Sequence, residues 1–316
     1  PDFDAIVAGA KPAWAAAAFF LTRAGLRVLV LEKARLPRYK ACGGAIPRQA
    51  LDAFPFAFDS VIRAAPTCAQ FRFPGLPSVE VRLLDEPVVM VMRQDFDALI
   101  LARSGAEVLD GQAVTGIVET GSHVQVRTEA RTFTARYLVG ADGAASRVAH
   151  WLGLRQHRQL SPSLEAEVAA RGGEERFAGS DPRAVFCLGA LPWGYAWVFP
   201  KDGTLSVGIG RVRPGRLDLR AALRREMERL KLPLNGVQLH GHPLPCYQAP
   251  PWPLWSPWVW GLRDALRLPG WPQERLSTRR CLLVGDAAGL VDPLIGEGIR
   301  YAIGSARLAA EAIASD

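Results

Sequence analysis

The sequence predicts a two-domain α/β protein, in which a parallel-sheet domain is assembled from both ends of the chain and an antiparallel β-sheet domain is inserted into it. Three observations support this prediction. A strand, a helix and a second strand follow one another between Phe3 and Leu31. A short apolar strand and a long helix follow at the other end of the chain, after Arg280. The middle of the chain is rich in strand-like segments, several of which alternate apolar and polar side chains as antiparallel sheets do.

The first strand, helix and second strand have clear boundaries. Phe3 to Ala8 is short and apolar, and Pro12 to Ala24 is an alanine-rich helix with proline in its first turn. Gly25 ends that helix, and Arg27 to Leu31 is a second apolar strand. Strands joined by a crossover helix pair in parallel, so this βαβ unit begins a parallel sheet.

The remaining elements are short strands and three helices, separated by turns. The predicted strands are Gln70 to Phe73, Val79 to Leu83, Val88 to Met92, His123 to Thr128, Thr132 to Ala135, Tyr137 to Val139, Ala184 to Leu188, Ala196 to Pro200, Leu205 to Gly210 and Cys281 to Val284. The predicted helices are Phe96 to Arg103, Arg216 to Leu230 and Ile299 to Ile313. We assign residues 1–50, 88–160 and 275–316 to the first domain, and residues 51–87 and 161–274 to the inserted domain.

Composition and charge exclude several classes of protein. The chain is 49% hydrophobic and 22% charged, which is ordinary for a globular protein. Its net charge of +7 favours a phosphorylated substrate or an anionic membrane surface, but no dense Lys/Arg block predicts a nucleic-acid partner. The five cysteines are scattered without CxxC spacing, which predicts reduced thiols, a cytoplasmic location and no metal site.

Two further features concern membranes. No basic segment precedes the first apolar run, so we expect no signal peptide, and Ala13 to Leu21 is shorter than the ~20 residues that span a bilayer. Ala249 to Trp271 contains five tryptophans and many prolines. It is either a surface loop that packs its aromatic side chains onto the body, or an apolar lip for a lipid tail or membrane surface.

The segment after the first strand reads Gly9-Ala10-Lys11-Pro12-Ala13-Trp14. A dinucleotide fingerprint uses glycine at the first, third and sixth of these positions, for a tight turn, for approach to the pyrophosphate and for helix packing. Only Gly9 is glycine here. Lys11 places an ammonium where phosphate oxygens are expected, and Trp14 adds bulk that typically costs ~1–3 kcal/mol. Glu32, at the end of the second strand, has the spacing of a ribose ligand.

Two more motifs follow buried strands. Residues 140–147 read GADGAASR, in which Asp142 can organise a turn and reach a pyrophosphate or ribose. Residues 284–299 read VGDAAGLVDPLIGEGI, in which Asp286 follows a strand and Gly298-Ile299 opens a helix. The amino end of a helix stabilises negative charge, as on a phosphate or a reduced flavin ring. This order of motifs predicts a bound nucleotide.

The same order resembles that of FAD-dependent hydroxylases and reductases with the fold of p-hydroxybenzoate hydroxylase. Residues 38–45, RYKACGGA, and residues 192–200, PWGYAWVFP, resemble the Cys-Gly-Gly loop and the aromatic signature of geranylgeranyl reductases. The resemblance covers nearly the whole chain. It implies a Rossmann-like FAD-binding domain with an inserted antiparallel β-sheet substrate domain, and reduction of carbon–carbon double bonds in isoprenoid chains.

The resemblance also implies roles for individual residues. The implied cofactor-binding residues are Gly9, Ala13, Glu32, Arg38, Cys42, Gly43, Ala45, Arg93, Val114, Asp142, Asp286, Gly298 and Ile299. Tyr195 and Trp197 would form a wall of the isoprenoid cavity. Cys42 is a candidate proton donor because of its position alone. A buried thiol that only packs against its neighbours fits that position equally well. NAD(P)H would reach the flavin transiently, since no second nucleotide-binding motif is present.

Two alternatives remain open at this point. A flavin monooxygenase or halogenase has the same fold, although the Cys-Gly-Gly and aromatic segments favour the reductase. A non-catalytic relative that binds isoprenoid lipids would explain Lys11 and Trp14. Prenyl substrates partition into lipid, so either reading is compatible with peripheral contact at a membrane.

Overall fold

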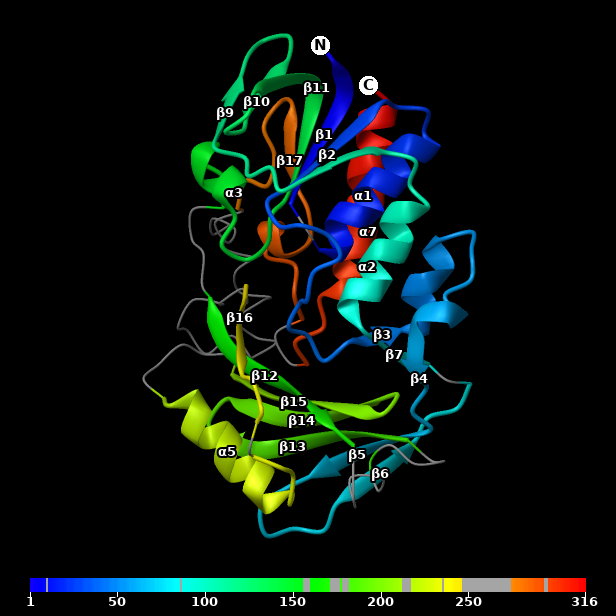
Figure 1. The fold of residues 1–316 in the computed structure, drawn as a ribbon, viewed down its shortest axis with the longest axis vertical. Helices are drawn as coiled ribbons and strands as arrows, with labels where there is room; N and C mark the ends of the chain where they lie inside the picture. Colours follow the sequence, from blue (N-terminus) through cyan, green and yellow to red (C-terminus); the bar gives the residue numbers. More distant parts are fainter. Residues whose placement is uncertain are drawn as a thin grey trace, which may run out of the picture.

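The computed structural model describes residues 1–9, 11–85, 87–155, 160–170, 177, 182–211, 217–234, 236–245, 274–292 and 295–316. Two large sheets lie one above the other along the long axis of the molecule (Figure 1). The upper sheet has helices on its face, and both chain termini lie at its upper end. The predicted α/β fold class is confirmed. The tryptophan-rich segment 249–271 lies outside the described residues.

The upper sheet contains the predicted βαβ unit. Its strand order is β8 (Glu107–Asp110), β2 (Val28–Glu32), β1 (Phe3–Gly9), β11 (Thr132–Ala141), β10 (Val124–Arg127) and β9 (Gly116–Glu119), and β17 (Cys281–Leu283) pairs with β11. β1 is parallel to β2 and β11, and β11 is parallel to β17. The carboxyl ends of these strands therefore lie at one edge, where α/β sheets bind ligands.

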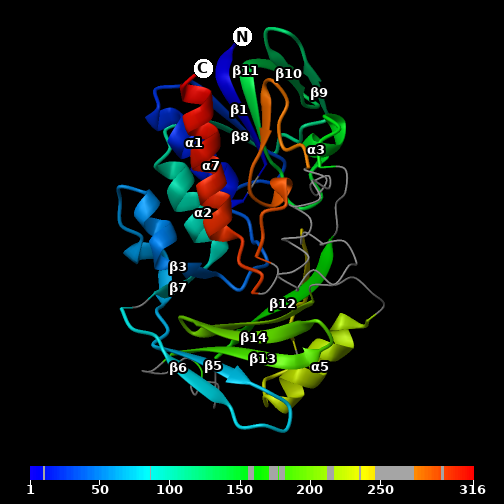
Figure 2. The same cartoon turned by 180° about the vertical axis from the view of Figure 1, so that it is seen from behind.

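Three helices lie side by side on one face of this sheet: α1 (Pro12–Arg23), α2 (Arg93–Ala102) and α7 (Ile299–Ala314) (Figures 1 and 2). α1 and α7 meet through small side chains, since Ala13, Ala16, Ala306 and Ala310 are all buried. Small residues allow helix axes to approach closely. The two ends of the chain are thereby packed into one core. The opposite face is covered by α3 (Arg147–Trp151), whose Val148 packs with Ile6.

The lower sheet has the strand order β16 (His240–Leu244), β12 (Ser161–Ala169), β15 (Thr204–Arg211), β14 (Gly194–Lys201), β13 (Arg183–Leu191), β5 (Cys68–Arg72) and β6 (Val79–Arg82). Every pair is antiparallel except β5–β13. Side chains alternate between its faces. Val198 and Val207 pack in one core with Leu223 and Met227 of α5 (Leu219–Arg229), which leaves Trp197 and Phe199 on the face toward the upper sheet.

A small third sheet joins the two large ones. It pairs β3 (Ala45–Pro47) and β4 (Ile62–Ala64) with β7 (Val88–Val91), and two short 3₁₀ helices, Arg48–Ala53 and Asp59–Val61, lie beside it. Met90 of β7 packs with Phe199 of the lower sheet. A further 3₁₀ turn, η3 (Gly285–Ala288), follows β17. No helix in the described part of the chain has the length and apolarity to cross a bilayer.

Candidate functional site

A cavity lies between the upper and lower sheets, at the carboxyl end of β1, and we call it the central cavity. Its wall combines the amino end of α1, the segment from Lys40 to Ala45, one face of the lower sheet and the segment that leads into α7. These segments are far apart in the sequence, and the upper sheet brings their ends together. The space is lined mainly by apolar atoms, with several charged side chains at one side.

The strand ends meet so closely that one position requires glycine. Gly9 has a φ of +137°, and a Cβ there would lie 2.3 Å from the carbonyl carbon of Ala141. The following turn on β11 is organised by Asp142, whose carboxylate accepts hydrogen bonds from Ser146 Oγ at 2.5 Å and from the Arg147 amide at 2.7 Å. Asp142 therefore fixes the start of α3, and it does not line the central cavity.

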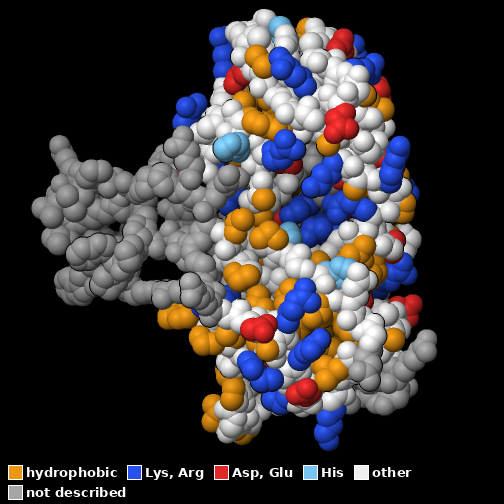
Figure 3. All heavy atoms as spheres, turned by 60° about the vertical axis from the view of Figure 1, so that its left-hand side comes forward, with side chains coloured by type: hydrophobic (Ala, Val, Ile, Leu, Met, Phe, Trp, Pro, Cys, Tyr) orange, Lys and Arg blue, Asp and Glu red, His pale blue; other side chains and the backbone are white. Residues whose placement is uncertain are grey.

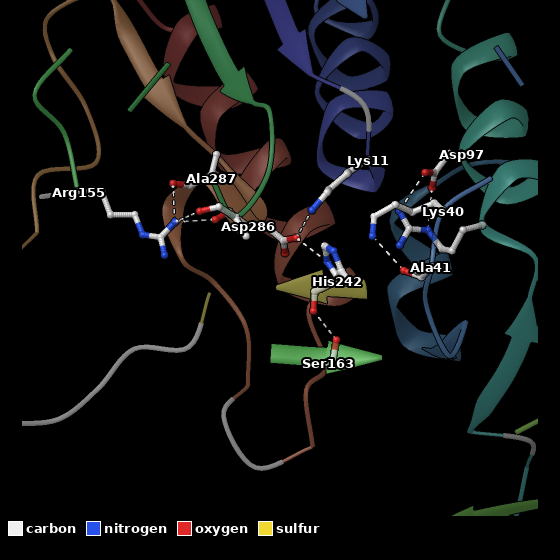
Figure 4. A network of polar contacts seen from close by, with 11 residues as sticks. Lys11, Lys40, Ala41, Asp97, Arg155, Ser163, His242, Asp286 and Ala287 are labelled. Atoms are coloured by element: carbon white, nitrogen blue, oxygen red, sulfur yellow. Dashed lines mark hydrogen bonds and ion pairs between the residues drawn. The ribbon is translucent and has the colours of Figure 1, made fainter. Parts of the chain in front are cut away.

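Lys11 and Asp286 form an ion pair at the cavity wall, with Nζ 2.6 Å from Oδ2 (Figure 4). His242 Nε2 lies 3.7 Å from the same oxygen. Burial alone would raise the pKa of Asp286, but the ammonium of Lys11 and the adjacent His242 ring outweigh it and hold that pKa well below its usual range. Burial lowers the pKa of His242 to about 4, so its ring is neutral at pH 7.

Arg155 holds the turn that presents Asp286. Its guanidinium donates to the carbonyl oxygens of Asp286 and Ala287 at 2.8 and 3.2 Å, as Figure 4 shows. Arg155 is buried, so these bonds are shielded from water. The backbone of η3 is thus fixed from one side while the Asp286 carboxylate points to Lys11 on the other.

Trp14 lies away from the central cavity. Its side chain is 1% exposed, packs in the core of α1, α2 and α7, and borders a second cavity with Leu36, Gln94 and Ala98. The indole Nε1 has no hydrogen-bond partner among the described residues. The space beside Gly9 and Lys11 is therefore not filled by the indole.

The Cys-Gly-Gly segment passes along the cavity close to β7. Gly44 has a φ of +77°, and a Cβ there would lie 2.2 Å from the carbonyl oxygen of Val91. Gly43 faces the Phe199 ring, with its Cβ position 2.8 Å from Cδ2. Because both positions are glycine, the backbone of this segment packs directly against β7 and Phe199. This places the partly buried Cys42 at the central cavity.

Two cations lie beside this segment. Arg93 is buried and makes a two-pronged ion pair with Asp97, at 3.1 and 2.9 Å. Lys40 Nζ donates to the carbonyl oxygen of Ala41 at 2.9 Å. Burial, followed by the charges of Lys11 and Arg93, lowers the pKa of Lys40 to about 7. The cavity therefore concentrates positive charge on the side of the upper sheet.

The lower sheet contributes four rings on one face, Phe186, Tyr195, Trp197 and Phe199, which we call the aromatic wall. The centroids of neighbouring rings are 5.9 Å apart for Phe186–Tyr195 and 6.1 Å apart for Tyr195–Trp197. Gly208 makes room for Trp197, because a Cβ there would lie 2.0 Å from the indole. The Tyr195 hydroxyl donates to the carbonyl oxygen of Ile295 and so links the wall to the segment before α7.

Two carboxyl groups on β12 lie beside the aromatic wall. Glu165 and Glu167 are two residues apart on one face of the strand, and Glu165 lines the cavity. Glu165 Oε1 accepts a hydrogen bond from Ser206 at 2.9 Å, and Glu167 Oε1 accepts one from Lys201 at 2.6 Å. Burial, together with the neighbouring Glu167 carboxylate, outweighs the Lys201 charge and raises the pKa of Glu165 to about 7.

The amino end of α7 completes the cavity. Gly298 and Ile299 line it, and Gly298 has no side chain to cap the helix. The Glu297 carboxylate accepts a hydrogen bond from the Arg300 amide at 2.7 Å. The helix dipole adds partial positive charge at this point, which suits an electron-rich ring or an anion.

Ten of the predicted site residues line the central cavity: Ala13, Cys42, Gly43, Ala45, Arg93, Tyr195, Trp197, Asp286, Gly298 and Ile299. Five do not, namely Gly9, Glu32, Arg38, Val114 and Asp142. Glu32 is buried at the end of β2, where it accepts a hydrogen bond from the Ala34 amide at 2.8 Å and lies 3.7 Å from Arg38. Burial raises the pKa of the Glu32 carboxyl. Val114 packs against the core on the α3 side of the sheet.

The sequence motifs missed Lys40, Glu165 and His242 as members of the site. Lys40 lies inside a recognised segment, but the other two come from β12 and β16, which are absent from the predicted strands. A signal for β12 exists, since Leu164, Ala166 and Val168 alternate with polar residues. Nothing in the sequence shows that β12 pairs with β16 and places Ser163 opposite His242.

Comparison with known proteins agrees with this architecture. Residues 87–187 match the family model described as an FAD binding domain. The geranylgeranyl diphosphate reductase of Rhodobacter capsulatus is 31% identical over 98% of this chain and 74% of its own length. The menaquinone reductase of Mycolicibacterium smegmatis is 28% identical over 99% of this chain and 76% of its own length.

A solved structure shares the fold. The geranylgeranyl bacteriochlorophyll reductase-like protein of Thermoplasma acidophilum superimposes with a TM-score of 0.78 at 23% identity, over 99% of this chain and 78% of that chain. At this identity the likeness concerns the fold.

Proposed function

The chain belongs to the geranylgeranyl reductase family of FAD-dependent oxidoreductases, and we propose that it reduces carbon–carbon double bonds in an isoprenoid chain. The observation that supports this most directly is the central cavity. It lies between the Cys-Gly-Gly segment and the amino end of α7 on one side and the aromatic wall on the other. An apolar chain without polar groups needs such a wall, because it is held by packing and by exclusion of water.

The residues present fit FAD. The strand ends at Gly9 leave no room for a Cβ, as a close-packed phosphate turn requires, and the indole of Trp14 does not enter the central cavity. Lys11 brings an ammonium to the cavity wall, which suits a diphosphate. Gly298 and Ile299 bring the amino end of α7 to the cavity without a large side chain at Gly298, and the helix dipole there suits the electron-rich edge of a flavin. When bound, FAD supplies the hydride for alkene reduction.

We assign the binding of FAD to residues at the amino ends of α1 and α7 and on the neighbouring strand ends and turns. Gly9, Ala13 and Asp142 would lie at the diphosphate, Glu32 and Arg38 at the adenosine ribose, Val114 at the adenine, and Asp286, Gly298 and Ile299 at the ribityl chain and ring. Cys42, Gly43, Ala45 and Arg93 would border the ring. In this proposal the flavin domain comprises residues 1–50, 88–160 and 275–316, and the substrate domain comprises residues 51–87 and 161–274.

The side chains around the substrate have separable roles in this proposal. Tyr195 and Trp197 orient the isoprenoid chain, and their rings exclude water from the reacting alkene. Cys42 borders the same space, as a proton donor or as a packing thiol. A transiently bound NAD(P)H is the proposed electron donor.

The surface charge favours a substrate with an anionic head group or a position at an anionic membrane surface. In the face drawn in Figure 3, Lys and Arg side chains gather at mid-height, beside apolar side chains. The net charge of the whole chain is +7. Positive potential raises the local concentration of anionic ligands. A prenyl diphosphate, or a prenylated lipid in a membrane that the protein contacts peripherally, matches both features.

The test is a single-turnover experiment on the purified protein. The flavin absorbance is recorded first, the protein is reduced with one equivalent of dithionite without oxygen, and geranylgeranyl diphosphate is added. Return of the oxidised-flavin spectrum with a product two hydrogens heavier per double bond supports the proposal. A colourless protein that still binds the prenyl lipid supports the non-catalytic alternative, and turnover that requires oxygen supports a monooxygenase or halogenase.

A further inference from the structure

Glu165 occupies a place in the cavity that packing alone does not explain. Its side chain is 2% exposed, it lines the central cavity beside Trp197, and it is a carboxyl group next to an apolar wall. Burying an ionised carboxylate without a paired cation is costly, so such groups are kept where their chemistry is used. Lys201 forms its ion pair with Glu167, and no ion pair of Glu165 is found among the described side chains.

Glu167 gives an independent reason to place a proton on Glu165. Glu165 and Glu167 lie two residues apart on one face of β12, so their carboxyl groups are neighbours. Glu167 Oε2 is buried and receives no hydrogen bond from any described residue. Lys201 Nζ lies 2.6 Å from the other oxygen of Glu167. A proton on Glu165 removes the repulsion that two neighbouring buried carboxylates would have.

Tyr39 connects this carboxyl group to solvent. Its hydroxyl lies 3.4 Å from Glu165 Oε2, its side chain is 37% exposed, and its ring packs on His240 at 4.5 Å. Burial and the two carboxyl groups raise the pKa of Tyr39, so it stays a neutral hydroxyl that can accept a proton and pass one on.

We infer that Glu165 donates the proton that completes reduction of the isoprenoid double bond, and that Tyr39 returns a proton to it from solvent. The inference rests on the proposed function. One alkene carbon receives a hydride from the reduced cofactor, the π electron pair forms the new C–H bond with the Glu165 proton at the other carbon, and Glu165 is left as a carboxylate. Solvent reprotonates it through Tyr39, and a two-electron donor such as NAD(P)H restores the reduced cofactor.

The decisive variant is Glu165→Gln, which keeps the shape of the side chain and loses the acid. We expect the single-turnover oxidation of the reduced protein by geranylgeranyl diphosphate to slow ~100-fold or more. In the wild type this rate should fall tenfold per pH unit above about 7, because the protonated carboxyl is the active form. The variant should lose that dependence while its flavin content stays unchanged. Glu129→Gln, an exposed change of the same type, is the control.

Three further readouts separate proton donation from a structural role. The wild-type rate should show a solvent deuterium isotope effect that changes with pH around 7, and Glu165→Gln should remove that pH dependence. Infrared spectra of the protein should show a protonated carboxyl band that disappears between pH 6 and pH 8 and is missing in the variant. Tyr39→Phe should leave the first turnover intact and slow repeated turnover.

The outcomes distinguish the inference from the function on which it rests. If the wild type does not oxidise its flavin with any prenyl substrate, the proposed function fails. If the wild type does so and Glu165→Gln keeps its rate and pH profile, or Cys42→Ser alone removes the pH dependence, the inference is wrong. Should Glu165→Gln not fold, absence of the titrating carboxyl band in the wild type overturns the inference.

Discussion

The ammonium of Lys11 lies 2.6 Å from the carboxylate of Asp286, which joins the turn after the first strand to the turn before the last helix. The two residues are 275 positions apart in the sequence. Their side chains are only 15% and 16% exposed, so the pair is shielded from solvent. A position that dinucleotide-binding loops give to glycine is here used to tie the two ends of the chain together at the cavity wall.

Lys11→Met should therefore destabilise the protein. Loss of the ammonium leaves the buried Asp286 carboxylate without its ion-pair partner, and an unpaired buried charge costs up to about 3–5 kcal/mol. The pKa of Asp286 is lowered by folding, so its contribution is present above the ordinary carboxyl pKa and is lost as the pH falls below it. Urea unfolding should show the full difference between wild type and variant at pH 7 and a shrinking difference below about pH 4.

The control for this prediction is the double variant Lys11→Met with Asp286→Asn. Removing both charges leaves no buried ion, so it should recover most of the stability that Lys11→Met loses. Equal stability of the single and double variants would show that the ion pair has no part in the loss.

Trp14 should behave as a core residue and not as an obstacle in the cofactor site. Trp14→Gly removes a fully buried indole, and glycine in a helix loses more backbone entropy on folding than other residues. The variant should therefore have a free energy of unfolding about 3–5 kcal/mol lower than the wild type. Trp14→Phe keeps a ring and removes the unpaired indole N–H, so it should cost much less. Chemical denaturation of both variants tests this. A neutral Trp14→Gly would mean that the indole is loosely packed.

Gly208→Ala should disturb the aromatic wall without affecting the flavin domain. The new Cβ would lie 2.0 Å from the Trp197 ring, so the indole must move. We expect prenyl-substrate affinity to fall about tenfold, since a displaced ring of this size forfeits ~1–2 kcal/mol of packing. Flavin content, read from the absorbance ratio of the purified protein, should not change.

Gly121→Ala is the matched control, because Gly121 has no atom within 4 Å of its Cβ position. Weaker flavin binding in Gly208→Ala, with unchanged substrate affinity, would contradict the assignment of this face to the substrate.

The parts of the site that could be predicted from sequence are those in which the backbone itself is constrained. Gly9 and Gly44 are required by positive φ and by close approach to neighbouring backbone, and such glycines stand out as motifs. The βαβ unit and the helix after Gly298 could also be predicted, because their hydrophobic periodicity and turn residues lie within short stretches of sequence.

The rest depends on contacts between distant segments. The direction of the Trp14 side chain is set by α2, which no local pattern relates to α1. Glu165 and His242 reach the cavity because β12 and β16 pair in one register, and a shift of one residue would turn both side chains to the α5 face. In a strand that alternates apolar and polar residues, a glutamate is expected on the solvent-exposed face. Its burial is therefore visible only in the folded protein.

Lys40 gives a prediction with an unusual pH dependence. Burial, and after it the charges of Lys11 and Arg93, lower the pKa of Lys40 to about 7 in the folded protein, whereas the unfolded chain keeps the ordinary value near 10.5. A lowered lysine pKa means that the charged form is disfavoured by folding. Lys40→Met should therefore stabilise the cofactor-free protein at pH 6, and the gain should shrink as the pH rises from about 7 toward 10.5.

A bound diphosphate should reverse this preference, because it pairs with the protonated amine. FAD affinity of the wild type, measured by quenching of flavin fluorescence, should weaken as the pH rises through about 7. Lys40→Met should bind FAD more weakly at pH 6 and lose this pH dependence. If Lys40→Met is destabilised at pH 6, the lysine is held by a favourable contact, and the positive charge at this side of the cavity is structural instead of reserved for an anionic ligand.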